Sequence, residues 1–224
     1  MMRVLDDWAP GALVPIYRLD QMMAKQQQVV IVGGGVIGLL TAFNLATQGQ
    51  AVILLERAGV GQESSWAGGG IVSPLYPWRY SPAVTALAHW SQDFYPQLAE
   101  RLFAATGVDP EVHTTGLYWL DLDDETEALE WAAREGRPLS KVDVSAAHDA
   151  VPVLGRGYSQ AIYMANVANV RNPRLVKSLK AALQALPNVT LREHCEITGF
   201  SREGERICGV ETVDGPIRAD QVVL

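Results

Sequence analysis

The chain has 224 residues and a formal net charge of −7 at pH 7, and 48% of its residues are hydrophobic. This length allows one large domain or two modest ones with proper cores. The acidic balance, with no basic stripe and no Lys/Arg run interleaved with aromatic residues, argues against a nucleic-acid partner. No apolar run approaches the length of a membrane span and no signal peptide is visible, so we expect a cytoplasmic protein with no membrane partner.

The first 28 residues follow no clear hydrophobic period. They contain Pro10, Gly11, Pro15 and a run of glutamines at 26–28. We expect residues 1–28 to be a disordered N-terminal extension, since a segment of this composition needs no packing. Met22 would be a natural start for the domain that follows, and a genuine N-terminal arm is the alternative.

Residues 29–38 are the most informative stretch of the chain. Its first four residues are apolar and predict a buried parallel strand. Gly33, Gly35 and Gly38 then follow at the spacing G-x-G-x-x-G. Gly33 permits the turn, Gly35 lets a pyrophosphate approach the backbone, and Gly38 lets a helix pack closely on the strand.

The predicted helix begins with Val36 and Ile37, and it would point its free N–H groups and positive dipole end at the phosphates. A second strand over 51–55 ends in Glu56. A carboxylate at this point can accept both hydroxyls of an adenosine ribose and repels a 2′-phosphate, which favours FAD or NAD over NADP. A glycine-rich turn with no ligand is the alternative interpretation.

A second glycine-rich stretch lies over residues 62–74. It holds two hydroxyls and three glycines: Ser64, Ser65, Gly68, Gly69 and Gly70. Hydroxyls and bare backbone N–H groups form a good anion cradle, and glycines let a flat ring lie against the main chain. A flexible loop is the alternative, but Trp66 and the apolar pair at 71–72 indicate a packed segment.

Together, the stretches at 29–38, 56–57 and 64–70 resemble the D-amino-acid oxidase family of FAD-dependent amine oxidases. Within that family the similarity is greatest to the bacterial glycine oxidases of thiamine biosynthesis. Further matching segments lie at 74–78, 115–120, 170–175 and 219–224. The resemblance covers essentially everything from residue 29 onward.

This resemblance implies FAD as the cofactor. By position in the family, Ser64 and Ser65 lie near the flavin pyrophosphate, Gly69 and Gly70 lie along the isoalloxazine ring, and Ile197 lies at the adenine. The expected cofactor-binding residues are Gly33, Gly35, Val36, Ile37, Gly38, Glu56, Arg57, Ser64, Ser65, Gly68, Gly69, Gly70 and Ile197.

The next element is a long helix predicted over residues 82–106, with Ser81 as N-cap and Gly107 just after its end. Its apolar stripe consists of Val84, Leu87, Phe94, Leu98 and Leu102. His89 and Trp90 lie on or beside this helix, and we interpret both as core residues rather than chemical groups.

The stretch 109–168 predicts the first part of an antiparallel substrate-binding lobe. It contains an expected strand over 111–121, a short helix after the acidic turn at 123–125, a helix over 145–150 and a strand over 161–164. The acidic turn is better explained as a solvated helix start than as a metal site. We likewise interpret His113, His148 and His194 as structural or surface residues.

The chain then returns to the first domain through an amphipathic helix with Asn172 as N-cap and Pro173 at its first position. Expected strands follow at 189–192, 196–200, 207–213 and 217–224. Cys195 and Cys208 have no second pair near them, so we expect two reduced thiols.

The fold class is therefore α/β (α+β overall). We expect a discontinuous Rossmann-like FAD-binding domain over 29–108 and 169–224, with the mainly antiparallel lobe of 109–168 inserted into it. The chain stops inside an apolar run, so the C-terminal part of both domains is expected to be missing. The strand edge at 217–224 would favour a homo-oligomer.

The resemblance implies a small amino acid or secondary amine as substrate and dioxygen as electron acceptor. A hydride passes from the substrate to the flavin, and the imine hydrolyses to a keto acid and ammonia, with hydrogen peroxide as the second product. The arginine that pairs with the substrate carboxylate is expected beyond Leu224, so we expect no catalytic residue and no metal site in this chain. The alternatives are a D-amino-acid dehydrogenase or sarcosine oxidase-like enzyme, an NAD-dependent dehydrogenase, or an FAD-binding remnant without turnover.

Overall fold

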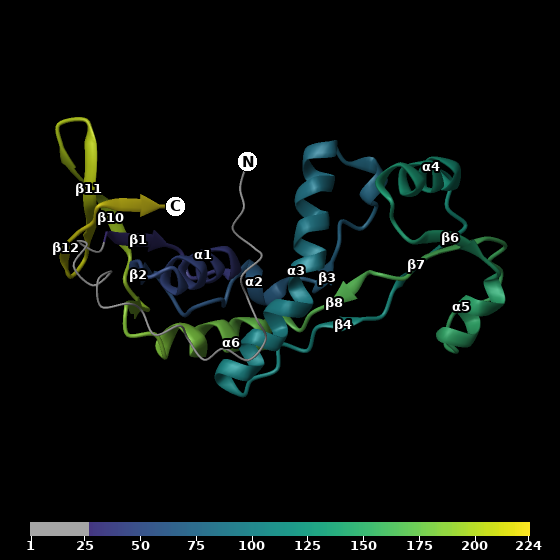
Figure 1. The fold of residues 1–224 in the computed structure, drawn as a ribbon, viewed down its shortest axis with the longest axis horizontal. Helices are drawn as coiled ribbons and strands as arrows, with labels where there is room; N and C mark the ends of the chain where they lie inside the picture. Colours follow the sequence, from purple (N-terminus) through teal and green to yellow (C-terminus); the bar gives the residue numbers. More distant parts are fainter. Residues whose placement is uncertain (1–26) are drawn as a thin grey trace.

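The computed structural model describes residues 27–224, and its larger part is built on a parallel four-stranded sheet (Figure 1). The strand order is β13 (Gln221–Val223), β1 (Gln28–Val32), β2 (Ala51–Leu55) and β9 (Val189–Arg192). In β1 the three central side chains are at most 2% exposed. The strand is thus buried on both faces, as its unbroken apolar run predicts.

One face of this sheet is covered by α1 (Val36–Thr47) and α6 (Asn172–Gln184), and the C-terminal half of α3 (Pro82–Thr106) extends the same apolar cluster by packing against α6. Their contact residues include Leu39, Leu179 and Leu183, each of which is fully buried. Burial of a leucine side chain contributes about 1.5–3 kcal/mol relative to exposure. This layer therefore supplies much of the stability of the larger part.

The other face of the sheet is covered by an antiparallel meander of β10 (Ile197–Glu203), β11 (Arg206–Thr212) and β12 (Gly215–Arg218). In Figure 1 this meander stands at the left end of the molecule, beside β1 and β2.

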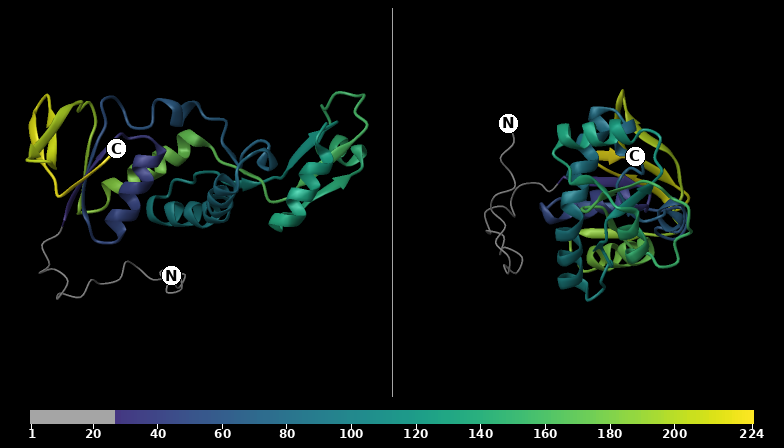
Figure 2. Two further views of the ribbon diagram at one scale, coloured as in Figure 1. Left: turned by 90° about the horizontal axis from the view of Figure 1, so that it is seen from above. Right: turned by 90° about the vertical axis from the view of Figure 1, so that its right-hand side faces the viewer.

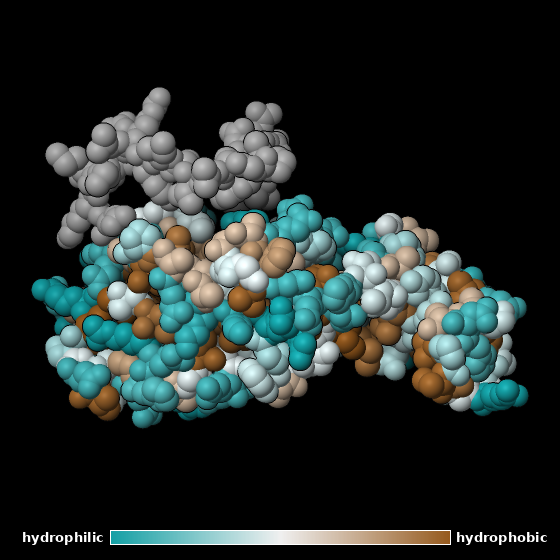
Figure 3. Space-filling model, turned by 90° about the horizontal axis from the view of Figure 1, so that it is seen from below, coloured by the Kyte–Doolittle hydropathy of each residue, from teal (hydrophilic) through white to brown (hydrophobic). Residues whose placement is uncertain are grey.

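A smaller lobe forms the opposite end of the molecule, as the view from above in Figure 2 makes clear. Its antiparallel sheet has the order β5 (Leu117–Leu120), β7 (Ala161–Met164) and β6 (Leu139–Val142). The helices α4 (Glu125–Glu135) and α5 (Val144–Ala150) complete the lobe. It has its own apolar cluster around Trp78, Trp119 and Trp131. The space-filling view in Figure 3 shows the lobe as a separate, smaller mass beside the larger one.

The two parts are joined by a three-stranded sheet of β3 (Ile71–Val72), β8 (Ala168–Asn169) and β4 (His113–Thr114). Beside it, Glu111 forms ion pairs with Arg171 at 3.2 Å and with Arg174 at 2.9 Å. These ion pairs connect the segment that leads into the smaller lobe with the segment that returns from it.

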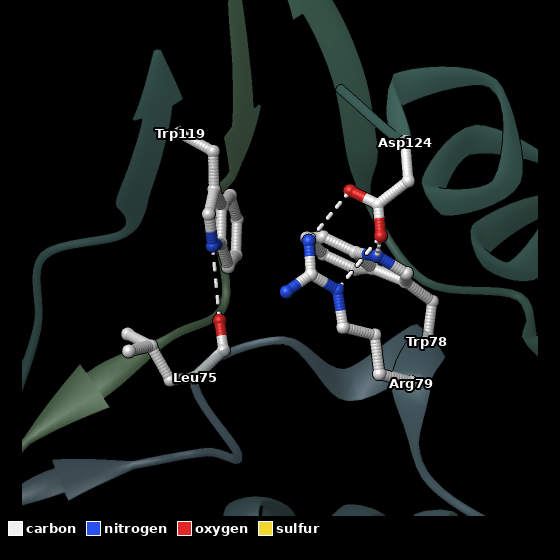
Figure 4. Close-up of polar contacts among 5 residues, drawn as sticks. All are labelled: Leu75, Trp78, Arg79, Trp119 and Asp124. Atoms are coloured by element: carbon white, nitrogen blue, oxygen red, sulfur yellow. Dashed lines mark hydrogen bonds and ion pairs between the residues drawn. The ribbon is translucent and has the colours of Figure 1, made fainter. Parts of the chain in front are cut away.

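The segment after β3 is anchored to the lobe by a polar network (Figure 4). It contains a 3₁₀ helix of one turn, η2 (Pro77–Arg79), from which Arg79 Nε and Trp78 Nε1 donate to Asp124 Oδ2 at 2.7 and 2.8 Å. Trp119 Nε1 donates to the carbonyl of Leu75 at 2.9 Å. The hydrogen bonds from Arg79 and Trp78 hold the pKa of Asp124 at about 2. Asp124 is thus an anchored residue of the α4 start rather than a freely solvated one.

Most predicted elements are confirmed, including the long helix over 82–106, which has the predicted bounds and Gly107 in a left-handed conformation after its end. The prediction of an unbroken strand over 111–121 is wrong, because Gly116 has a φ of 72° and separates β4 from β5. The strand expected over 217–224 is in fact two strands, β12 and β13, which belong to different sheets. The last helix includes Asn172, and Arg171 occupies the N-cap position.

Three burial predictions are wrong. Val84 and Leu87 of the α3 stripe are 42% and 69% exposed, because only the second half of the helix joins the apolar cluster that contains α6. Trp90 is 56% exposed and stacks on Phe94 rather than entering the core. Trp66 is also 56% exposed, since the four-residue helix α2 (Ser64–Ala67) lies on the surface.

The expected extension over residues 1–28 lies, up to residue 26, outside the described residues, and Gln28 already belongs to β1. Both cysteines are free thiols, as predicted. Within residues 27–224 no helix combines the length and apolar character that a membrane crossing requires.

Candidate functional site

The turn between β1 and α1 has the geometry for which its glycines are needed. Gly33 has a φ of 104°, which side-chain-bearing residues rarely adopt, and its N–H donates to the carbonyl of Leu55 at 2.8 Å. A side chain at Gly38 would overlap the carbonyl oxygen of Gly33. The first helical turn therefore lies directly on the end of β1, as the G-x-G-x-x-G spacing predicts.

The N-terminus of α1 is polar and open to solvent. Its first turn carries no acidic residue, and the first N–H groups of any helix lack acceptors within the helix. One of them, the N–H of Val36, donates to Ser65 Oγ at 2.9 Å. A Cβ on Gly35 would lie 3.2 Å from the same hydroxyl. Next to it the side chain of Ile37 is 74% exposed.

Glu56 stands at the end of β2, as predicted, but it is only 9% exposed and both its oxygens accept backbone hydrogen bonds. Oε2 accepts from the N–H of Gly34 at 2.7 Å, and Oε1 accepts from the N–H of Ala58 at 2.8 Å. This carboxylate therefore fixes the turn after β1 and the loop after β2. Each oxygen retains a further lone pair, so an additional hydroxyl donor can still be accommodated.

Gly34 is a residue that the motif spacing did not single out. A Cβ at this position would lie 3.0 Å both from Cβ of Glu56 and from Cγ2 of Val60. The absence of a side chain lets the turn approach the carboxylate, and a side chain here would push against Glu56 and Val60.

Two adjoining cavities lie along the glycine-rich stretch, with volumes of about 300 and 500 Å³. Both are lined by Gly68, Tyr95 and Asn172, so they form one trough. The smaller cavity is also lined by Val36, Ile37, Ser64, Ser65, Leu175 and Val176. The larger is also lined by Gly69, Gly70, Ile71, Val72, Ser73, Pro74, Ala88, Ser91, Gln92 and Val170. The trough thus runs from the N-terminus of α1 to the middle of α3.

The three glycines of the second glycine-rich stretch differ in how much room their neighbours leave for a side chain. Asn172 Nδ2 donates to the carbonyl of Gly68 at 2.8 Å, and a Cβ on Gly68 would lie 2.6 Å from that nitrogen. Gly70 has a φ of 72°, and a Cβ there would overlap the carbonyl oxygen of Val170. Gly69 has nothing within 4 Å of a Cβ. Backbone packing therefore requires Gly70. A side chain at Gly68 would displace the Asn172 amide, and Gly69 faces open space.

Two side chains of α3 enter the trough without having been predicted. Gln92 is 8% exposed, and its buried Nε2 has no hydrogen-bond partner. Tyr95 lines both cavities, and burial raises the pKa of its phenol. Their spacing of three residues places both on one helix face. No sequence signal set them apart from other polar residues of the helix.

Arg57 and Ile197 lie outside the lining of both cavities. Arg57 is exposed and its Nη2 pairs with Glu63 Oε1 at 2.7 Å, an ion pair that raises the pKa of Arg57. Ile197 begins β10 and packs into the apolar cluster on the meander side of the sheet. The N–H of Cys195 donates to the Glu56 carbonyl at 2.9 Å, which keeps the start of β10 near the end of β2.

The described residues contain no group of His, Cys, Asp and Glu side chains that could hold a metal ion. Neither cavity is lined by a lysine, arginine or histidine of the described part of the chain. The polar groups that the trough offers are therefore backbone groups, hydroxyls and amides.

Comparison with known proteins agrees with this picture. A family model described as FAD dependent oxidoreductase (DAO) matches residues 28–224. The chain is 78% identical over 198 residues to a glycine oxidase of Pseudomonas putida and 63% identical over 198 residues to a glycine oxidase of Pseudomonas aeruginosa. Each match covers 88% of this chain and 54% of the relative. The chain thus spans about half the length of the curated relatives it matches.

Among solved structures, the glycine oxidase of Bacillus cereus superposes with a TM-score of 0.78 at 28% identity, over 88% of this chain and 54% of the other. The predicted α/β fold class and the resemblance to FAD-dependent amino-acid oxidases are both confirmed.

Proposed function

Because the chain belongs to the DAO family of FAD-dependent oxidoreductases, we propose that the protein oxidises glycine or another small amino acid or secondary amine. FAD is the cofactor that family membership implies. The observation that carries the proposal is the trough between α1 and α3, which combines an open helix N-terminus with a glycine-lined cavity. The identity of 78% to a glycine oxidase supports glycine as the substrate.

The smaller cavity suits the pyrophosphate of FAD. Phosphate groups are favoured at a helix N-terminus, where the positive end of the dipole contributes about 0.3–1 kcal/mol per charge. Gly35 adds no side chain here, and Ser64 and Ser65 supply hydroxyl donors. We assign the pyrophosphate to these residues together with the N–H group of Ile37. Val36 would act indirectly, because its own N–H donates to Ser65 Oγ.

The larger cavity suits the flavin ring. Its floor is formed by Gly68, Gly69 and Gly70, and its wall contains the unpartnered amide of Gln92. A buried donor without a partner is costly, so its presence indicates a ligand with hydrogen-bond acceptors. When bound there, FAD supplies the chemistry: it accepts a hydride from the substrate and passes electrons to dioxygen, with hydrogen peroxide as product.

We assign the adenosine to the region of Glu56, Arg57 and Ile197. Glu56 lies at the end of β2, where it would accept ribose hydroxyls and repel a 2′-phosphate. Gly33 and Gly38 would act indirectly, by shaping the turn that presents the helix N-terminus. We further propose that residues 29–108 and 169–224 form the FAD-binding domain and that 109–168 begin the substrate-binding lobe.

In this proposal the residues of the chain bind and orient the cofactor, and none of them exchanges a proton with the substrate. The substrate carboxylate would be recognised by an arginine outside residues 1–224. A role in cytoplasmic thiamine biosynthesis follows from the resemblance to glycine oxidases of that process.

The test is a titration of the purified chain with FAD, followed by addition of glycine and a peroxide assay. Tight FAD binding with peroxide formation supports the whole proposal. Binding without peroxide supports an FAD-binding chain without turnover. A chain that binds NAD but not FAD would overturn the proposal.

A further inference from the structure

Within the described residues, four side chains have a buried polar atom without a hydrogen-bond partner, and Gln92 is the one of the four that lines the trough. The residue is only 8% exposed, yet its Nε2 makes no hydrogen bond. Leaving an amide N–H unpaired inside a protein is unfavourable, and most buried polar atoms in proteins have a partner. A residue of this kind in a cavity wall indicates that the partner comes from a ligand.

The backbone at this point of α3 also lacks one regular helical hydrogen bond. Pro96 lies inside the helix, four residues after Gln92. A proline has no N–H, so the carbonyl of Gln92 cannot receive the usual helical hydrogen bond. Gln92 thus has two polar groups without their usual partners, one on the side chain and one on the backbone.

The surroundings of Gln92 select a flat, polar ligand. The same cavity is lined on one side by Gly68, Gly69 and Gly70, which offer bare backbone. On the side of α3, Tyr95 stands next to Gln92 along the helix face. A ring that lies against the glycines and presents carbonyl and N–H groups at its edge would satisfy a primary amide, which both donates and accepts.

We propose that Gln92 is a cofactor-binding residue that hydrogen-bonds the edge of the flavin ring of FAD. This inference rests on the proposed function, because it assumes that FAD occupies the trough. It adds a contact from α3, an element that contributes no residue to the G-x-G-x-x-G turn or to the second glycine-rich stretch. The amide thereby fixes the ring end of the cofactor while α1 fixes the phosphate end.

The test compares FAD with ADP, which lacks the flavin ring, in binding titrations of wild type and Gln92→Leu. We expect Gln92→Leu to weaken FAD binding by about three- to tenfold, the usual effect of one neutral hydrogen bond, and to leave ADP binding unchanged. The visible spectrum of the bound flavin should also shift. The matched control is Gln97→Leu, which changes an exposed glutamine of the same helix and should alter neither affinity.

Stability of the FAD-free chain gives a second readout that a structural glutamine would not produce. Removing an unpaired buried amide should leave the FAD-free chain at least as stable as wild type, because no hydrogen bond is lost. If Gln92→Leu binds FAD as wild type does, with an unchanged flavin spectrum, the inference is wrong. It is also wrong if the variant loses ADP and FAD affinity equally. A wild-type chain that binds ADP but not FAD would instead overturn the proposed function.

Discussion

Replacement of Glu56 by alanine separates the two roles that this residue can have. If Glu56 served only a bound ribose, the change would leave the FAD-free chain as stable as wild type. In the structure, however, its carboxylate accepts the N–H of Gly34 at 2.7 Å and that of Ala58 at 2.8 Å, and the side chain is 9% exposed. The change therefore removes two hydrogen bonds to a charged acceptor and leaves one buried and one partly buried N–H donor behind.

The expected size of this effect follows from the two bonds. A hydrogen bond to a charged group contributes about 1.5–3 kcal/mol, so two give about 3–6 kcal/mol if they act independently. Neighbouring bonds are seldom additive, so we expect the lower part of that range. Urea unfolding of the FAD-free Glu56→Ala chain measures this free energy directly. A loss smaller than about 0.5 kcal/mol, the usual size of a surface change, would refute the assignment of both backbone bonds.

Three further predictions concern the turn, the glycine floor and the lobe anchor. Gly38→Ala should lower the free energy of unfolding by about 1–3 kcal/mol or more, because its Cβ meets a backbone carbonyl that cannot move aside; an unchanged Tm would contradict this. Gly69→Ala should leave the free energy of unfolding of the FAD-free chain within about 0.5 kcal/mol of wild type but weaken FAD binding. Gly70→Ala should also destabilise the FAD-free chain, because its Cβ meets the Val170 carbonyl. Equal Tm values for the two variants would contradict the open space found beside Gly69. Asp124 has a pKa of about 2 when paired with Arg79, below its unfolded value, so its stabilisation is complete above about pH 4 and is lost as the pH falls through about 2. The stability difference between wild type and Asp124→Asn should shrink over that range, and a difference that grows on acidification would exclude the pairing.

The local parts of the fold were predictable from the sequence. The turn at Gly33 and Gly38 follows from backbone geometry that only glycine tolerates, and these constraints act within a few residues. The bounds of α3 follow equally from local features, with Pro82 at its first position and Gly107 after its last turn.

The parts that depend on distant segments were not predictable. The exposure of Leu87 depends on how far along α3 the apolar cluster with α6 extends, which no helical period reveals. The double hydrogen bonding of Glu56 depends on the path of two loops that meet it from different strands. Gln92 could be recognised only once its neighbours were known, because a glutamine in a helix carries no sign that it lacks a partner.

The central claim is that the trough from α1 to α3 holds FAD, and it is tested most directly by parallel FAD titrations of wild type and Gly35→Val, followed by visible absorption. Gly35 lies beside Ser65 Oγ at the N-terminus of α1, so a valine there would fill the space assigned to the pyrophosphate. The account predicts a flavin spectrum and saturable binding for wild type, and loss of both in a folded Gly35→Val chain. A folded Gly35→Val chain that binds FAD as tightly as wild type would contradict it.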